Sequence, residues 1–216
     1  NGAFKLTEWK HKESMKLEKN EFYHEADKIN LDEVNFVILE EQNTEWQMYQ
    51  TGELDLVNNL PSDVEGKLIA EKNPEVYSDL QLSVYYYNLN TDKKPLNNVK
   101  VRKALAMALN RQVITENVAQ GGQPPAYSVI PPGVPDTKGD FSENSGQLFK
   151  EDVEEAKKLL EEGLKEEGLT EMPEFTILYN TSEGHKKIAE AAQEMWRQAF
   201  GFTVQLENVE FQVKLD

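Results

Sequence analysis

Apolar and polar side chains alternate in two stretches near the start of the chain. Residues 3–10 (AFKLTEWK) and 14–20 (SMKLEKN) place apolar side chains at alternate positions, which is the period of a strand with one buried face. A short polar connection separates them, so the pattern predicts an antiparallel pair. Residues 35–40 (NFVILE) form a continuous apolar run and predict a buried strand.

The pattern then moves between helical and extended periods. The predicted elements, in chain order, are a helix capped by Asn43 or Thr44 and closed by Gly52, a strand at 54–59, a helix from Ser62 to about Lys72, and a long strand at 80–90.

The strongest helical signal follows Asn98, where apolar side chains recur at i, i+4 and i+8. Asn110 is expected to start a second helix, and Gly121 with its neighbouring glycine is expected to stop it. Residues 123–135 (QPPAYSVIPPGVP) contain five prolines, which exclude a helix and predict an extended connection. Residues 136–146 are expected to form a polar loop.

The last part of the chain has a strand–helix–strand pattern. An amphipathic helix is predicted at 152–164, a strand at 174–180, a helix from the cap Ser182 to Gly201, and a strand at 202–209. Strands that alternate with helices indicate an α/β fold. The proline-rich stretch is the best candidate for a domain boundary.

Charge and composition narrow the possible partners. The chain has 23 Lys and Arg against 39 Asp and Glu, a net charge of −16, which argues against binding nucleic acid or anionic lipid. It has no cysteine, so disulfides, zinc–thiolate sites and thiol nucleophiles are excluded. No apolar run reaches the length of a membrane span, and no signal-peptide pattern or initiating methionine is present. We therefore expect a piece of a longer protein.

The motifs of common enzymes are not found. The sequence has no GxSxG, P-loop or GxGxxG pattern, and its three histidines are too far apart for a metal motif. No catalytic residue, metal ligand or cofactor is predicted. An α/β hydrolase remains the less favoured alternative, since it would need a nucleophile–base pair that the sequence does not display.

The stretch VYYYNLN (84–90) combines phenols and amides. On a strand, Tyr85 and Tyr87 would share one face, while Tyr86, Asn88 and Asn90 would share the other. In one interpretation the first face packs in the core and Tyr86 lies under a loop. In the other, the polar face lines a binding cleft.

A second polar group, Asn180 to Ser182, follows the strand predicted at 174–180. Such residues most often cap the next helix. They also stand at the carboxyl end of a strand, where α/β folds bind ligands.

Residues 95–133 (PLNNVKVRKALAMALNRQVITENVAQGGQPPAYSVIPPG) resemble the signature region of extracellular solute-binding proteins of the oligopeptide-binding class, family 5. These proteins are the receptors of peptide ABC importers. The resemblance continues through the flanking stretches NGAFKLTEW, YQTGELDL, YYYNLNT and LYNTSEGHKKIAEAAQEMW. The residues that match the family pattern are Pro95, Asn97, Asn98, Val101, Arg102, Ala104, Leu105, Asn110, Arg111, Gly121, Pro125, Ala126, Pro131 and Pro132.

The resemblance implies a periplasmic-binding-protein-like fold (class II, cluster C), present in part. Residues 1–125 would form the rear part of the first lobe and 126–216 the front part of the second, peptide-side lobe, with the proline-rich crossover between them. The chain would be less than half of a complete receptor. The acidic residue that holds the peptide's α-amino group in the family would lie outside it.

The resemblance also implies which residues bind an extended peptide. By strand phase, Tyr86, Asn88 and Asn90 would face the cleft, and Tyr127 would lie near the hinge. His185 and Lys186 would approach the carboxylate end of the peptide or remain solvated on the surface. The full set of candidate ligand-binding residues is Tyr85, Tyr86, Tyr87, Asn88, Asn90, Tyr127, Asn180, Ser182, His185 and Lys186.

The implied function is the capture of oligopeptides for delivery to ABC permease subunits in the membrane. A receptor of the same fold for a dipeptide, a nickel chelate or a peptide pheromone is the alternative. A monomer is expected, either lipid-anchored on the extracellular face of a Gram-positive cell membrane or periplasmic in a Gram-negative cell. The isolated chain is expected to fold but to bind peptide weakly or not at all.

Overall fold

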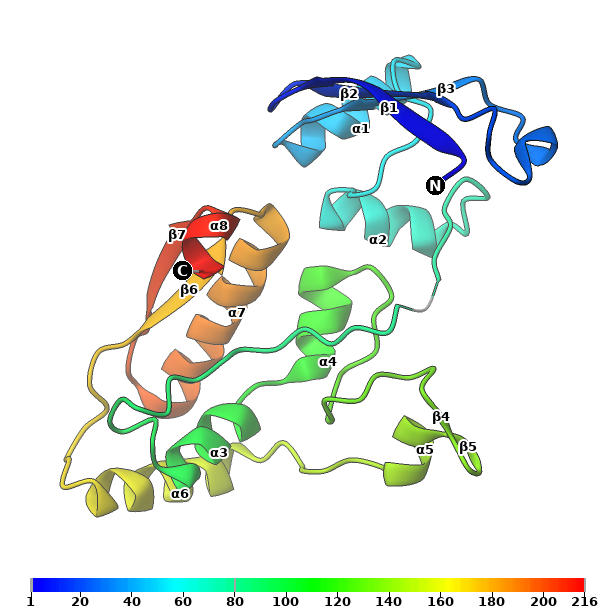
Figure 1. Cartoon of the computed structure of the whole chain (residues 1–216). Coiled ribbons are helices and arrows are strands. Elements are labelled where there is room, and N and C mark those ends of the chain that lie inside the picture. Colours follow the sequence, from blue (N-terminus) through cyan, green and yellow to red (C-terminus); the bar gives the residue numbers. More distant parts are fainter. Residues whose placement is uncertain (1, 80, 216) are drawn as a thin grey trace. The chain divides into compact units, whose positions relative to one another are not determined.

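The computed structural model describes residues 2–79 and 81–215 (Figure 1). The chain divides into two compact units, Asn1–Pro61 and Ser62–Asp216. The lobe boundary expected at residue 125 therefore falls inside the second unit, and the assignment of lobes stays a prediction.

The first unit contains an antiparallel sheet with strand order β1-β2-β3: β1 Phe4–Lys10, β2 Ser14–Lys19 and β3 Glu33–Val37. This confirms the predicted strand pair. Its register aligns apolar side chains across the sheet, since Leu17 pairs with both Leu6 and Val34. The run at 35–40 is less buried than predicted, since Phe36 and Val37 are 44% and 47% exposed.

The 3-10 turn η1 Ala26–Lys28 and the helix α1 Gln42–Thr51 complete the elements of this unit. Gly52 ends α1 in the left-handed conformation as expected, with φ 78°. The predicted cap was wrong, because Glu41 occupies the N-cap position and its side chain makes no capping hydrogen bond. The strand predicted at 54–59 is not formed, and Leu56 is 72% exposed.

The helices predicted at the start of the second unit are present: α2 Ser62–Ala70, α3 Val99–Met107 and α4 Arg111–Val113, which continues as the π-helical turn η2 Ile114–Ala119. Asn110 starts and caps α4 as expected, and Asn98 caps α3 as well. Asn98 Oδ1 accepts a hydrogen bond from the Lys100 N–H at 2.8 Å, and Asn110 Oδ1 accepts one from the Val113 N–H at 2.9 Å. Gln120, with φ 58°, ends the π-helical turn one residue before the predicted glycine stop.

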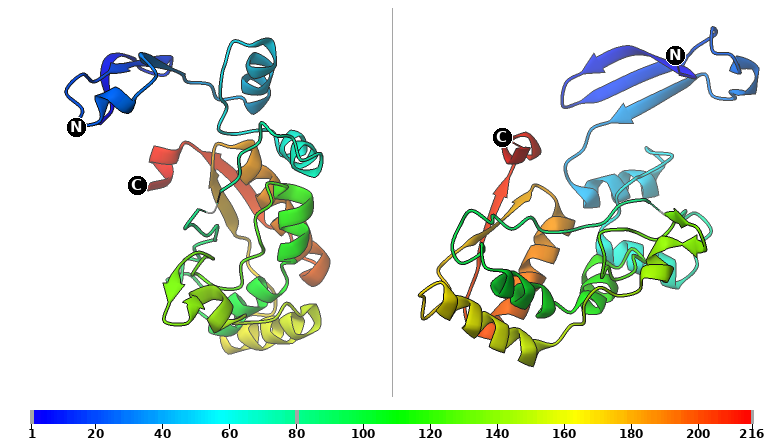
Figure 2. Two further views of the ribbon diagram at one scale, coloured as in Figure 1. Left: turned by 90° about the vertical axis from the view of Figure 1, so that its right-hand side faces the viewer. Right: turned by 60° about the horizontal axis from the view of Figure 1, so that its bottom comes forward.

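The strand–helix–strand pattern is confirmed as a parallel pair, β6 Thr176–Asn180 and β7 Gln205–Val209, joined by the helix α7 Glu183–Phe200. The views of Figure 2 show α7 running along these two strands. The helix α6 Val153–Glu166 precedes them and α8 Phe211–Leu215, which the sequence did not predict, follows.

Two expected segments differ from the structure. Residues 81–90 are extended but pair with no strand among the described residues, and Leu80 lies outside those residues. A strand needs a hydrogen-bonded neighbour, which periodicity alone does not guarantee. The expected loop at 136–146 instead contains a short hairpin, β4 Pro135–Asp136 with β5 Gly139–Asp140, and the helix α5 Phe141–Ser145, capped by Asp140.

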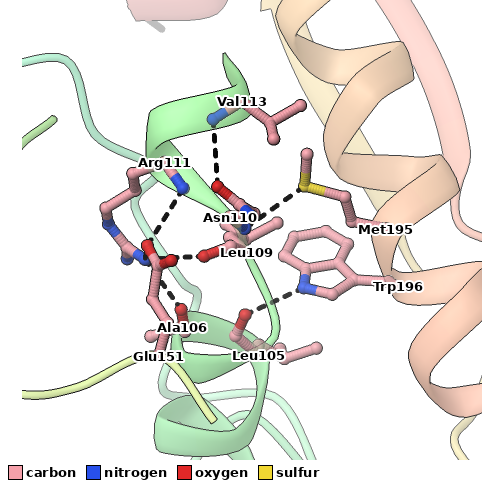
Figure 3. A network of polar contacts seen from close by, with 9 residues as sticks. All are labelled: Leu105, Ala106, Leu109, Asn110, Arg111, Val113, Glu151, Met195 and Trp196. Carbon is pink, nitrogen blue, oxygen red and sulfur yellow. Dashed lines mark hydrogen bonds and ion pairs between the residues drawn. The ribbon is translucent and has the colours of Figure 1, made fainter. Parts of the chain in front are cut away.

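The core of the second unit joins α3, α6 and α7 to the parallel strands. Val101 and Ala104 of α3 are fully buried against α6. Figure 3 shows how α7 meets the corner between α3 and α4: Trp196 Nε1 donates to the Leu105 carbonyl at 2.9 Å, and the Asn110 N–H donates to the Met195 sulfur at 3.4 Å. The corner is thereby fixed against the helix that connects the two strands.

Candidate functional site

The tyrosine-rich segment lies against the start of α7. The ring of Tyr85 packs edge-on against Tyr87, with centroids 6.0 Å apart, and lies 5.4 Å from the ring of His185. Tyr87 in turn packs against the core. Residues far apart in the sequence are therefore brought together at the carboxyl end of β6, where we expected a ligand site.

Exposure follows the predicted alternation from Tyr86 onward, whereas Tyr85, on the face expected to be buried, is 49% exposed. Tyr87 and Leu89 are half-buried, whereas Tyr86 is 67% exposed and Asn88 and Asn90 are exposed. The segment thus keeps the phase of a strand without a strand partner in the described chain. Its polar face offers a phenol and two amides to solvent, which are groups suited to hydrogen-bonding a polar ligand.

The Tyr87 hydroxyl is buried and forms no hydrogen bond of normal geometry among the described residues, and the phenol of Tyr85 interacts with it. Burial raises the pKa of Tyr87 well above its usual value, and partial burial also raises the pKa of Tyr85. Both phenols therefore remain protonated at neutral pH and can donate hydrogen bonds. A buried hydroxyl without such a bond is costly, so this group is a candidate for an interaction that the chain itself does not supply.

The second expected polar group caps α7. Ser182 Oγ accepts a hydrogen bond from the His185 N–H at 3.5 Å, so the helix-capping interpretation of Ser182 is confirmed. Asn180 is the half-buried last residue of β6, His185 is half-buried in the first turn of α7, and Lys186 is exposed beside it. The helix N-terminus and the lysine favour a negatively charged group at this position, and the Glu183 carboxylate in the same first turn opposes one.

Tyr127 lies in a different environment. Its ring is 5.8 Å from that of Phe149 and 5.8 Å from the guanidinium carbon of Arg111. Burial, with a smaller contribution from the Glu151 carboxylate, raises the pKa of the Tyr127 phenol. The structure therefore places the ten candidate residues at two locations: nine on the 85–90 segment and at the start of α7, and Tyr127 in the proline-rich connection.

An open hollow of about 370 Å³ was not anticipated from the sequence. It lies beside the π-helical turn, where the chain turns into the prolines, and none of the candidate residues lines it. The glycine–glycine and proline–proline pairs indicated a turn there but gave no sign of a hollow. The lining residues are Ile69, Thr115, Glu116, Gln120, Gly122, Gln123, Pro124 and Pro125.

The described residues form neither a metal-binding cluster nor a helix that could cross a membrane. Within residues 2–79 and 81–215, no group of three or more His, Cys, Asp or Glu side chains is placed to hold a metal ion. In the same part of the chain, no helix is long and apolar enough to cross a membrane.

Comparison with known proteins identifies the family. The family described as bacterial extracellular solute-binding proteins, family 5 Middle, matches residues 1–216. The chain belongs to this family. The resemblance inferred from residues 95–133 is thereby confirmed, and so is the periplasmic-binding-protein-like α/β fold, of which this family 5 chain covers a part.

Several of its relatives are named as peptide-binding proteins. The oligopeptide-binding protein OppA of Bacillus subtilis is 43% identical over the whole chain, and the dipeptide-binding protein DppE of the same organism is 39% identical. A crystal structure of the periplasmic oligopeptide-binding protein OppAIV of Borrelia burgdorferi superposes with a TM-score of 0.84 at 34% identity, over 98% of this chain and 41% of that one. The family 5 chain spans 40% of OppA and 39% of DppE.

Proposed function

We propose that the chain is part of the substrate-binding receptor of an oligopeptide ABC importer, and that the 84–90 segment contributes to its peptide-binding cleft. The observation that carries this proposal is the contact of Tyr85 with Tyr87 and His185, which holds the segment at the end of β6. Tyr86, Asn88 and Asn90 belong to the other face of the extended segment, and that face stays exposed.

The chemistry of the segment suits the main chain of a peptide. A peptide that is buried in a cleft must keep its N–H and C=O groups hydrogen-bonded, whatever its side chains are. The extended backbone of 81–90 forms no ladder with another strand in the described chain, so its own N–H and C=O groups can pair with an extended ligand. The exposed phenol and amides add donors and acceptors beside them.

The start of α7 suits the carboxylate end of such a peptide. Four N–H groups at a helix N-terminus point outward with a partial positive charge, and here Ser182 satisfies one of them. Lys186 adds a full positive charge next to His185. In this arrangement Asn180, His185 and Lys186 would set where the peptide ends.

Nuclear magnetic resonance of the isotopically labelled chain tests this proposal. We expect a mixture of tri- and tetrapeptides to shift the amide signals of Tyr86, Asn88 and Asn90, with a roughly millimolar dissociation constant. The affinity is expected to be weak because a chain spanning 40% of its relatives encloses the ligand incompletely, and ordering costs are then poorly offset.

A matched pair of variants supplies the control. Tyr86→Ala should weaken the peptide-induced shifts at Asn88 and Asn90. Tyr77→Ala should not, because Tyr77 is 94% exposed and lies outside the segment. Equal loss in both variants, or shifts that cluster away from 84–90 and the start of α7, would contradict the proposed site. Tight binding would show that the chain carries more of the site than we propose.

The dipeptide-binding relative supports a second candidate, a receptor for shorter peptides. The same titration distinguishes the two candidates. An oligopeptide site should respond more strongly to tri- and tetrapeptides than to dipeptides at equal concentration, whereas a dipeptide site should show the reverse order. A response to one defined peptide but not to a random mixture would instead indicate a pheromone receptor.

Transport requires partners beyond the chain. We propose that the complete receptor acts as a monomer in two lobes, 1–125 belonging to the first and 126–216 to the second, and delivers peptide to ABC permease subunits. A Gram-positive receptor would be held at the membrane surface by a lipid anchor. Sedimentation velocity of the purified chain should give a monomer of 24.7 kDa, and a larger species at micromolar concentration would argue against this state.

A further inference from the structure

Arg111 occupies the corner between α3 and α4 and binds several groups at once. Its backbone N–H donates to Glu151 Oε1 at 2.9 Å, and its guanidinium Nη1 lies 3.2 Å from the same oxygen (Figure 3). The same nitrogen donates to the carbonyls of Ala106 at 3.0 Å and Leu109 at 3.2 Å. The Arg111 and Glu151 side chains are 19% and 22% exposed, so salt screens this pair less than an exposed one.

Two aromatic rings pack against the same guanidinium. Its carbon lies 4.6 Å from the centroid of the Phe149 ring and 5.8 Å from that of Tyr127. The two rings meet edge to face at 5.8 Å and 64°. A guanidinium within about 6 Å of an aromatic ring is attracted to its face. Arg111 therefore contacts the chain at two further places, before α6 and in the proline-rich connection.

The proline-rich connection has little backbone structure of its own. Residues 123–134 contain no helix or strand, and proline lacks the N–H that a regular ladder would use. Val129 is 76% exposed, which shows that part of the connection faces solvent. Tyr127 contacts the rest of the chain at the middle of the connection. Near its end, the Gly133 N–H donates to Asp140 Oδ2 and the Val134 carbonyl accepts from the Phe141 N–H.

We propose that Arg111 is a positioning residue that clamps the proline-rich connection onto the α3–α4 corner through Tyr127, with Phe149 and Glu151 completing the clamp. The consequence of this clamp for ligand binding rests on the proposed function, in which the proline-rich connection joins two lobes. The clamp would then fix the path by which the chain leaves the first lobe. In this proposal Tyr127 acts through the position of the backbone.

The contacts require arginine specifically. The three polar contacts of the side chain come from Nη1, and the guanidinium carbon also lies over the Phe149 and Tyr127 rings, whereas a lysine ammonium is a compact point charge. Arg111→Lys thus keeps the charge and removes the clamp. Arg102→Lys is the matched control, because Arg102 lies in α3 and its Nη1 donates to the carbonyls of Leu96 at 2.9 Å and Asn97 at 2.8 Å, which precede its own helix.

The absence of cysteine makes a direct distance measurement possible. Cysteines placed at Val129 in the connection and at the exposed Glu161 of α6 would carry spin labels for double electron–electron resonance. We expect a narrow distance distribution in the parent chain and in Arg102→Lys. In Arg111→Lys it should be roughly twofold broader, because the local opening of the connection becomes favourable.

Tyr127→Leu tests the same clamp from the other side. It should broaden the distribution as Arg111→Lys does, and the double variant should add nothing further. An unchanged width in Arg111→Lys with the near-ultraviolet circular dichroism of the parent, or equal broadening in Arg102→Lys, would overturn the proposal. Should Arg111→Lys fail to fold, an unchanged width in Tyr127→Leu would overturn it equally. No peptide is present, so the outcome is independent of the proposed binding function.

Discussion

The packing of α3 on α6 leads to a prediction about Gly163. A Cβ atom at this position would lie 2.7 Å from Cγ2 of Val101 and 3.1 Å from Oδ1 of Asn98. Val101 is fully buried, and Asn98 Oδ1 caps α3 by accepting from the Lys100 N–H. Gly163→Ala would therefore force apart two helices at a point where neither neighbour can move away freely.

Two opposing effects set the magnitude. Overpacking in a filled core costs about 1–3 kcal/mol, and displacement of Asn98 weakens the α3 cap in addition. Alanine in a helix is favoured over glycine by about 1 kcal/mol. The steric cost is the larger effect here, so we expect Gly163→Ala to lower the free energy of unfolding of the second unit by roughly 1–2 kcal/mol.

Urea unfolding followed by tryptophan fluorescence measures this change. Trp196 is 3% exposed and binds the Leu105 carbonyl of α3, so its emission reports on the second unit. Replacing Trp9 and Trp46, which belong to the first unit, with phenylalanine removes the other two signals. The midpoint shift at constant m-value then gives the change in stability.

Gly184 provides the matched control. It lies in α7, and a Cβ there would come no closer than 3.7 Å to Ser182 Oγ, an ordinary contact. Gly184→Ala should thus be neutral or stabilising, by up to about 1 kcal/mol. If Gly163→Ala were as stable as the parent, the close approach of α3 and α6 would not be the reason for glycine at this position.

Two further predictions concern single side chains. Tyr87→Phe should raise the free energy of unfolding by about 1 kcal/mol, because it removes a buried hydroxyl that forms no hydrogen bond of normal geometry among the described residues; a loss of stability in urea unfolding would show that this hydroxyl is bonded in solution. Hydrogen bonds from Arg197 and then Gln198 lower the pKa of Glu194 to about 2, so this carboxylate contributes stability that is present above its usual pKa of 4.5 and is lost as the pH falls toward 2. Carbon-detected titration should show the Glu194 pKa rising toward 4.5 in Arg197→Met, and an unchanged pKa would contradict the pairing.

The elements predicted correctly from the sequence are those that local rules decide. Asn110 and Ser182 each cap the helix that follows them, as expected, because capping depends on one side chain and an N–H two or three residues away. Apolar periodicity likewise located α6 and α7. The failures are segments that depend on a distant partner. Residues 81–90 have the composition of a strand but pair with none in the described chain.

The candidate site likewise has one part that local sequence rules predict and another that depends on contacts between distant segments. Alternation in YYYNLN gave the phase that the structure shows, with Tyr86 exposed and Tyr87 half-buried, because the period of extended backbone is local. The contact between Tyr85 and His185 was not predictable, since it depends on how the segment crosses the end of β6. The resemblance placed Tyr127 near the hinge because of its position in the chain, and the structure shows its ring beside Arg111.

The extended 81–90 segment links the fold to the proposed function. Two side chains of one face hold the segment in place, since Tyr87 packs against the core and Tyr85 against His185. Its backbone forms no hydrogen-bonded ladder with a strand of the described chain. A segment that is anchored by its side chains is preorganised, so a ligand that pairs with it bears less of the ordering cost. Backbone pairing is indifferent to the ligand's side chains. Anchored tyrosines beside a free extended edge therefore provide the combination that a receptor for peptides of varied sequence requires.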